Sequence, residues 1–130
     1  FEARMVQVKI NKSNSNFFNG MEGSQLLVPV NHGEGKMIFP EHVSAKKIIS
    51  DNLVPMQFCT NKGIEAKEFP ENPNGSENGI TAVTNDDGRF LIMMPHPERS
   101  FLNNQLSWTN EKGKHSPWFK LFLNARNFYS

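Results

Sequence analysis

The stretch ITAVTNDDGRFLIMMPHPER, residues 80–99, is the part of this 130-residue chain that decides its fold. A β-rich run ends in Asp86-Asp87-Gly88, and a second run follows from Phe90 to Met94. Asp-Gly tolerates the positive φ of a tight turn, so the stretch predicts a β-hairpin. The second run is continuously apolar, which predicts a strand buried on both faces, as in a sheet covered by helices.

The hairpin delivers a histidine and a glutamate at its end. Pro95 and Pro97 each fix their own φ and restrict the preceding residue, so His96 is held between two constraints. Residues two apart in an extended backbone project to the same side, and His96 should therefore meet Glu98. A carboxylate beside an imidazole holds one tautomer and stabilises the imidazolium. We take His96 and Glu98 as candidate catalytic residues; the alternative is a turn in which Glu98 pairs with Arg99.

An acyl-transfer reaction would also need a nucleophile. The only thiol is Cys59, inside the strand pattern MQFCTNKG. It lacks the glycine-rich elbow that exposes a nucleophile, and free cysteine usually acts as a small buried hydrophobe. We therefore interpret Cys59 as structural, which leaves a base and its orienting carboxylate without a nucleophile.

A second His-x-Glu, formed by His32 and Glu34, lies in NHGEG. Together with His96 and Glu98 it would offer zinc-like ligands. The helical H-E-x-x-H spacing of catalytic zinc is absent, so no metal site is predicted. Two interpretations of this motif stay open: support at the rim of a substrate pocket or an interface, and a plain polar turn.

The remaining elements follow from local patterns. Pro29 within its apolar run marks an edge strand or the end of a strand. A helix is expected to start at Pro40, and a C-terminal helix to start at Ser116 as its cap. The expected elements are strands over 4–10 and 26–30, a helix over 40–52, a strand over 53–61 with a hairpin partner at 66–69, and a helix over 116–129. This pattern alone is typical of an α/β or α+β fold.

Composition excludes several function classes. The chain has 14 Lys+Arg against 13 Asp+Glu, a net charge of +1, and its charges are well mixed. A nucleic-acid-binding protein would need clustered basic charge. The single cysteine points to a reducing, cytoplasmic setting. No apolar run approaches the ~20 residues that span a bilayer, so neither nucleic acid nor membrane is an expected partner.

Four segments carry a family resemblance. They are FEARMVQVKI (1–10), FFNGMEGSQLLVPVNHGEGK (17–36), NPNGSENGITAVTNDDGRFLIMMPHPER (72–99) and SPWFKLFLNARNF (116–128). Together they resemble the C-terminal part of the glutaminase domain of the phosphoribosylformylglycinamidine synthases, in their large single-chain form. His-Pro-Glu alone is shared by all class I glutamine amidotransferases, and the third segment is the most specific.

The resemblance implies an α/β fold: the C-terminal half of a flavodoxin-like class I amidotransferase domain, with a mostly parallel sheet, flanking helices and a β-hairpin. Residues 1–130 would be the C-terminal portion of that domain, with the nucleophile-bearing part upstream and absent. His96 and Glu98 would be the histidine and glutamate of a Cys-His-Glu triad, with no cofactor or metal in this segment. The chain departs from the family in that Cys59 does not fill the nucleophile's place, and Lys36 stands where arginine is usual.

The implied activity is hydrolysis of glutamine to supply ammonia. The ammonia would pass to a synthetase domain of the same parent chain, which uses ATP and Mg to convert formylglycinamide ribonucleotide to the amidine in de novo purine biosynthesis. The segment alone is expected to be inactive, because the thiol is missing. The alternatives are a non-catalytic interaction or scaffold domain with a vestigial His-Pro-Glu, and a metal-dependent hydrolase. Trp108 and Trp118 are expected in the core or in docking to the larger chain.

Overall fold

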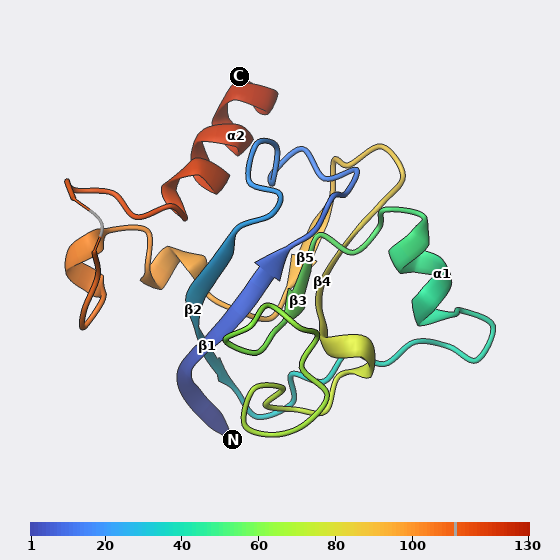
Figure 1. Cartoon of the computed structure of the whole chain (residues 1–130). Helices are drawn as coiled ribbons and strands as arrows, with labels where there is room; N and C mark the ends of the chain where they lie inside the picture. The colour runs from blue at the N-terminus through green and yellow to red at the C-terminus, as the bar shows by residue number, and fades with distance from the viewer. Residues whose placement is uncertain (111) are drawn as a thin grey trace.

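The computed structural model describes residues 1–110 and 112–130 (Figure 1). Its strands are β1 (Glu2–Ile10), β2 (Gln25–His32), β3 (Met56–Phe58), β4 (Ile80–Thr84) and β5 (Leu91–Met93). Its helices are α1 (Ala45–Ser50) and α2 (Phe119–Tyr129), with 3₁₀ turns η1 (Glu77–Gly79), η2 (Pro97–Arg99) and η3 (Asn103–Gln105). None of the helices in the described residues is long and apolar enough to cross a membrane.

The strands form one five-stranded sheet in the order β2-β1-β3-β4-β5. The α/β class is confirmed, but the prediction of a mostly parallel sheet is not, since every strand pair in the described residues is antiparallel. A parallel pair needs a long crossover between neighbouring strands. The crossover through α1 joins β2 to β3, which run in the same direction but lie on opposite sides of β1. The helix therefore creates no parallel pair.

The sheet is strongly curled. The Met94 N–H donates to Thr81 O on β4, and two residues later the His96 N–H donates to Pro29 O on β2. In a flat sheet, Met94 next to β4 and His96 next to β2 would be at least four strand spacings apart, about 19 Å. Two residues reach only about 7 Å. The β5 edge must therefore bend toward the β2 edge, giving the half-barrel whose strands lie in front of one another in Figure 1.

The main core lies against one face of the sheet. Val6, Val8 and Ile10 alternate inward along β1, as the period-two pattern predicted, and are at most 3% exposed. They pack with the loop after β1, with Leu121 of α2 and with Trp118, the residue before α2, both of which are buried. A smaller cluster of Ala45, Val54 and Ile80 joins α1 to the sheet. The larger cluster has buried residues from four strands, β1 to β4, and the smaller one holds α1 against β4.

Both predicted helices exist, but each is shorter than expected. α1 begins after Ser44, whose Oγ accepts from the Lys47 N–H, and not at Pro40. Ser44 provides this side-chain cap, which Pro40 has no group to supply. α2 begins at Phe119, but the expected cap is present: Ser116 Oγ accepts from the Trp118 N–H at 3.2 Å, and the Phe119 N–H donates to Ser116 O at 3.0 Å. The Ser116 hydroxyl also donates to Ser100 O.

The predicted hairpin between β4 and β5 is present, with Ala82 opposite Met93. Gly88 in its turn has φ +71°, and a Cβ there would lie 1.8 Å from Asn14 O, so only glycine fits. The prediction that the second strand is buried on both faces is wrong. β5 is an edge strand of the described sheet, and Ile92 is 61% exposed. Ile92 shares an open hollow with Val83 and Phe90, so its apolar neighbours lie beside it and do not cover it.

The other expected hairpin, between residues 53–61 and 66–69, is reduced to one bridge between Cys59 and Glu65. The strand prediction there holds only for Met56–Phe58. Pro29 lies in an edge strand, β2, as predicted.

Candidate active site

His96 and Glu98 lie in direct contact. His96 Nδ1 is 2.8 Å from Glu98 Oε1. The expected contact is present, but the extended backbone assumed for it is wrong, because Pro97–Arg99 form a 3₁₀ turn. The turn starts at Pro97, whose fixed φ suits the first helical position, and it folds Glu98 back over the ring.

The backbone of His96 is fixed to both ends of the curled sheet. Its N–H donates to Pro29 O at 2.8 Å, and two residues before it the Met94 N–H donates to Thr81 O at 3.1 Å. Pro95 and Pro97 on either side are buried. Pro29 has no N–H, so a neighbouring strand cannot pair fully with β2 at this position. Its carbonyl remains available to hold His96.

The chain after the turn is also fixed. The Arg99 N–H donates to His96 O and the Ser100 N–H to Pro97 O, each at 3.0 Å. The buried Ser116 donates its hydroxyl to Ser100 O. Hydrogen bonds therefore fix the residues before the His-Pro-Glu turn, the turn itself and the residue after it. A pair of reacting side chains requires such rigidity.

The contact determines how the histidine can react. Glu98 is an acceptor when ionised, so the Nδ1–H of the neutral ring points at the carboxylate. Nε2 then carries the lone pair and can take or give a proton. The His96 side chain is 33% exposed and that of Glu98 55%, so solvent or a substrate can reach the ring. The pair has the geometry of a base and its orienting carboxylate.

The second His-x-Glu has a different environment. The Asn74 amide nitrogen lies 2.9 Å from His32 Nδ1 and 3.1 Å from Nε2, and Glu34 is exposed. A Cβ on the buried Gly35 would lie 2.4 Å from the His32 ring and 2.5 Å from the Asn74 nitrogen. The structure thus joins His32 to Asn74 and Gly35.

Among residues 1–110 and 112–130, no three His, Cys, Asp or Glu side chains are arranged to hold a metal ion. The four members of the two His-x-Glu motifs therefore do not meet as one ligand set. The expectation that this segment carries no metal stays a prediction.

Cys59 is fully buried. Burial raises the pKa of its thiol, an effect that the charge of Lys9 opposes in part. The thiol therefore stays protonated at neutral pH, and it has no surface that a substrate could contact. This environment agrees with the structural role predicted for Cys59.

An apolar hollow adjoins the pair. Glu98, Phe101, Phe119 and Phe122 line a depression of about 220 Å³. Phe101 contacts Phe119 and Phe122 with ring centroids 6.3 Å and 5.7 Å apart. One wall of the candidate site is therefore aromatic and belongs to α2 and the segment that precedes η3.

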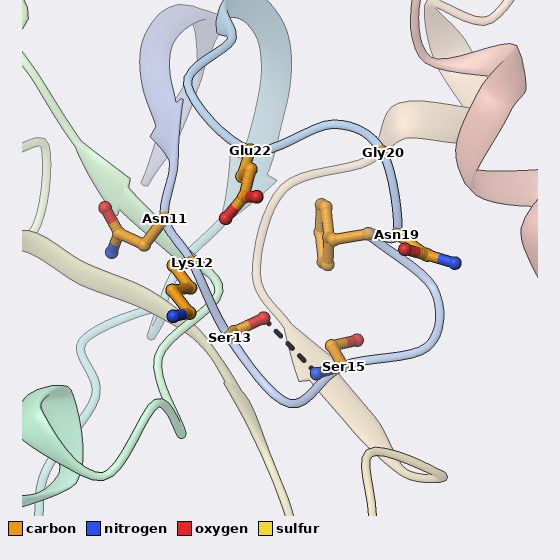
Figure 2. Close-up of a pocket in the computed structure, with 8 residues that line it drawn as sticks. Asn11, Lys12, Ser13, Ser15, Asn19, Gly20 and Glu22 are labelled. Atoms are coloured by element: carbon orange, nitrogen blue, oxygen red, sulfur yellow. Dashed lines mark hydrogen bonds between the residues drawn. The ribbon is translucent and has the colours of Figure 1, made fainter.

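A separate polar pocket of about 170 Å³ lies in the loop between β1 and β2 (Figure 2). Asn11, Lys12, Ser13, Asn19 and Glu22 are among its lining residues, and the Ser15 N–H donates to Ser13 Oγ at 3.3 Å. It begins just after Ile10, five residues along β1 from Met5, the partner of Pro29. That separation is about 17 Å, so this pocket is not part of the His96 site.

Sequence reasoning missed the residues that hold the pair in place. Pro29 carried a usable signal, since it marked an edge strand and so a carbonyl free to bond outside the sheet. The sequence predicts Ser116 as a helix cap, which its bond from the Trp118 N–H confirms, but its second bond, to Ser100 O, joins segments 16 residues apart. Nothing in the local sequence shows which distant carbonyl such a hydroxyl selects.

The family model for the CobB/CobQ-like glutamine amidotransferase domain matches residues 1–129, and the chain belongs to this family. Its fold is also similar to a solved structure titled "Structure of PurLQS from Thermotoga maritima", with a TM-score of 0.67 and 22% sequence identity. That match covers 99% of this chain and 48% of the other, so this chain spans about half the length of the structure it resembles.

Proposed function

We propose that this chain is the C-terminal portion of the glutaminase domain of a phosphoribosylformylglycinamidine synthase. It would hydrolyse glutamine in the cytoplasm to supply ammonia for the ATP-dependent formation of formylglycinamidine ribonucleotide in purine biosynthesis. The observation that carries the proposal is the 2.8 Å contact between His96 Nδ1 and Glu98 Oε1, in a chain that belongs to a glutamine amidotransferase family.

The nucleophile in this proposal is a cysteine outside the described chain. Cys59 is unsuitable because it is buried and its thiol pKa is raised. The β5 edge supports the idea that a further part of the domain lies next to this one, since Phe90 and Ile92 are 71% and 61% exposed. An upstream segment that carries the cysteine would cover this edge and bring a thiolate to His96 Nε2.

In the first half of the reaction, the thiolate attacks the side-chain amide carbon of glutamine. The His96 imidazolium donates its Nε2 proton to the amide nitrogen, which leaves as ammonia, and a thioester forms. Glu98 holds the ring through Nδ1 and stabilises its charged form. His96 ends this half neutral, with its lone pair on Nε2.

In the second half, water attacks the thioester and gives its proton to His96 Nε2. Glutamate leaves with its new carboxylate oxygen from water, and the thiolate is restored. Glutamine and water have then become glutamate and ammonia. The ammonia passes to a synthetase partner in the same parent chain, where ATP and Mg belong.

The test is His96→Ala in the full-length enzyme that contains this chain. We expect glutamine hydrolysis, and synthesis that depends on it, to fall by a factor of about 100 or more, because general acid–base catalysis contributes that much. Synthesis supplied with free ammonium should persist. Ammonia release from glutamine and product formation from each nitrogen source are the measurements.

His42→Ala provides a matched control, because His42 is exposed in the loop before α1. Unchanged glutamine hydrolysis in His96→Ala would instead favour the alternative, a scaffold domain with a vestigial His-Pro-Glu. Loss of synthesis from both glutamine and ammonium would indicate that His96→Ala is misfolded. His96→Gln, whose side chain is closer in size to histidine, then replaces the alanine variant.

A further inference from the structure

A closed loop follows the candidate active site directly. Residues 103–115 leave and return at one point, where Leu102 and His115 form an isolated bridge. The Asn103 N–H donates to Lys114 O at 2.9 Å, and the Asn103 side-chain amide donates to Gly113 O at 3.0 Å. These contacts hold the two ends of the loop together at its base.

The base of this loop is bonded to the catalytic turn. The Ser116 N–H donates to Phe101 O at 2.8 Å, and the Ser116 hydroxyl donates to Ser100 O, one residue beyond η2. His115 stacks on Phe119 with ring centroids 3.8 Å apart, and Phe119 lines the aromatic hollow beside Glu98. Gln105, within the loop, also donates its side-chain N–H to Glu98 O at 3.5 Å. A displacement of the loop base would therefore move groups beside Glu98.

The two tryptophans of the chain have opposite environments. Trp118 is 2% exposed, and its indole N–H donates to Leu27 O at 2.8 Å. Trp108, near the loop tip, is 76% exposed. With Leu27, which is 52% exposed, and Leu106, it lines a groove of about 200 Å³ between the loop and β2. Of the two tryptophans expected in the core or in docking, Trp118 belongs to the core and Trp108 to the surface.

We propose that Trp108, Leu106 and Leu27 form the surface that docks the ammonia-consuming synthetase part of the enzyme, and that loop 103–115 transmits this contact to the His96–Glu98 turn. The inference rests on the proposed function, which requires such a partner. Exposed tryptophans are among the residues that contribute most to protein interfaces. Docking at Trp108 would set the position of Ser116 and, through Ser100, of the turn that carries Glu98.

Two exposed charges of the loop bear on the partner's surface. Lys112 and Lys114 are exposed in the loop that forms one wall of the groove. Acidic side chains at the edge of the partner's apolar surface would complement these two charges. We expect the synthetase surface that docks here to have such an edge.

Hydroxyl-radical footprinting of the full-length enzyme tests the surface without relying on activity. The oxidation rate of Trp108 is compared with that of Trp118, the buried reference, and of Ile38, which is 80% exposed and lies near α1. We expect Trp108 to be protected nearly as well as Trp118. Oxidation of Trp108 at the rate of an exposed side chain would overturn the proposal. Protection that disappears on dilution to the monomer would also overturn it, since the occupant would then be a second copy.

The transmission is tested by Trp108→Ala in the same enzyme. We expect the rate of glutamine hydrolysis in this enzyme to fall about 10-fold, a typical consequence of losing an interface tryptophan. Trp108→Phe should restore part of the rate, and Ile38→Ala should leave it unchanged. A wild-type rate in Trp108→Ala would refute the transmission from the docking surface to the turn. If His96→Ala leaves hydrolysis intact, the proposed function fails, while the footprint still decides the docking surface.

Discussion

The chain contains two His-x-Glu motifs, and only one of them forms a pair. His96 lies 2.8 Å from Glu98, whereas the partner of His32 is Asn74 and Glu34 is exposed. The difference lies in the residues around the two motifs. His96 stands between prolines and begins a 3₁₀ turn, while His32 ends a strand and precedes Gly33 and Gly35, which impose no such turn.

The comparison shows that spacing along the chain does not determine the chemistry of a motif. The contact between His96 and Glu98 needs the backbone to turn so that the second side chain returns over the first. Prolines produce this turn at residues 95–98, and hydrogen bonds to Pro29 and from Ser116 keep it. At residues 32–35, Gly35 has no side chain, which leaves room for the His32 ring and the Asn74 amide next to it.

The largest difference between the motifs should appear on removing their carboxylates. In the full-length enzyme, Glu98→Gln should lower glutamine-dependent activity by about 100-fold, because the imidazolium loses its stabilising charge. Glu34→Gln is the matched variant and should change it less than about 3-fold, as befits an exposed side chain. Steady-state rates with glutamine and with ammonium measure both. Equal losses in the two variants would show that the motifs share one site.

A smaller effect is expected at Gly35. A methyl group there would enter the space of the His32 ring and the Asn74 amide. Both side chains are half-buried and can shift, so Gly35→Ala should destabilise the domain by about 1–2 kcal/mol. Gly75→Ala is a useful reference, since no atom lies within 4 Å of its Cβ position, although its φ of +66° carries its own strain. Chemical denaturation compares the two. A Gly35→Ala protein as stable as wild type would mean that the loop is not packed on His32.

The contact of His32 with Asn74 should contribute less. Asn74→Ala removes one side-chain hydrogen bond, which is worth about 1 kcal/mol. We expect a melting temperature lower by a few degrees and little change in the kcat for glutamine hydrolysis. A large loss of kcat with unchanged stability would instead place His32 in the reaction and favour the substrate-rim interpretation of NHGEG.

The smallest effect concerns Cys59, the thiol outside both motifs. Its pKa is raised in the folded protein, so the folded state keeps its proton after the unfolded thiol ionises at about pH 8.5. The contribution of the protonated Cys59 thiol to the free energy of unfolding is therefore fully present below that pH. Above it, this contribution declines by up to about 1.4 kcal/mol per pH unit. Cys59→Ala should remove this part of the decline between pH 8 and 10. Rapid alkylation of Cys59 in the folded enzyme at pH 7 would contradict the assignment.

Much of the structure could be predicted from local patterns. The alternation in residues 4–10 identified β1, and Asp87-Gly88 identified the β4–β5 turn, because each depends on neighbouring residues only. Pro29 identified an edge because a missing N–H has the same consequence in any sheet. The contact between His96 and Glu98 was expected for a related reason, since the prolines beside them restrict the backbone locally.

The errors arise where distant residues decide. The direction of the strands depends on which neighbours pair, and the run 90–94 looks the same at a sheet edge as in its centre. The start of α1 was decided by the Ser44 hydroxyl, which outweighed the proline signal four residues earlier. The bond by which Ser116 supports the turn could not be predicted, because only the folded chain brings Ser116 next to Ser100.

The two borders of the sheet are unequal. Along β2, the outward carbonyls of Leu27 and Pro29 already bond to Trp118 and His96, and proline offers no donor. Along β5, apolar side chains stand open to solvent. A chain with one edge strand able to pair and one edge strand already bonded can add only one neighbouring chain. The separated chain should therefore form strand-paired dimers and not fibrils.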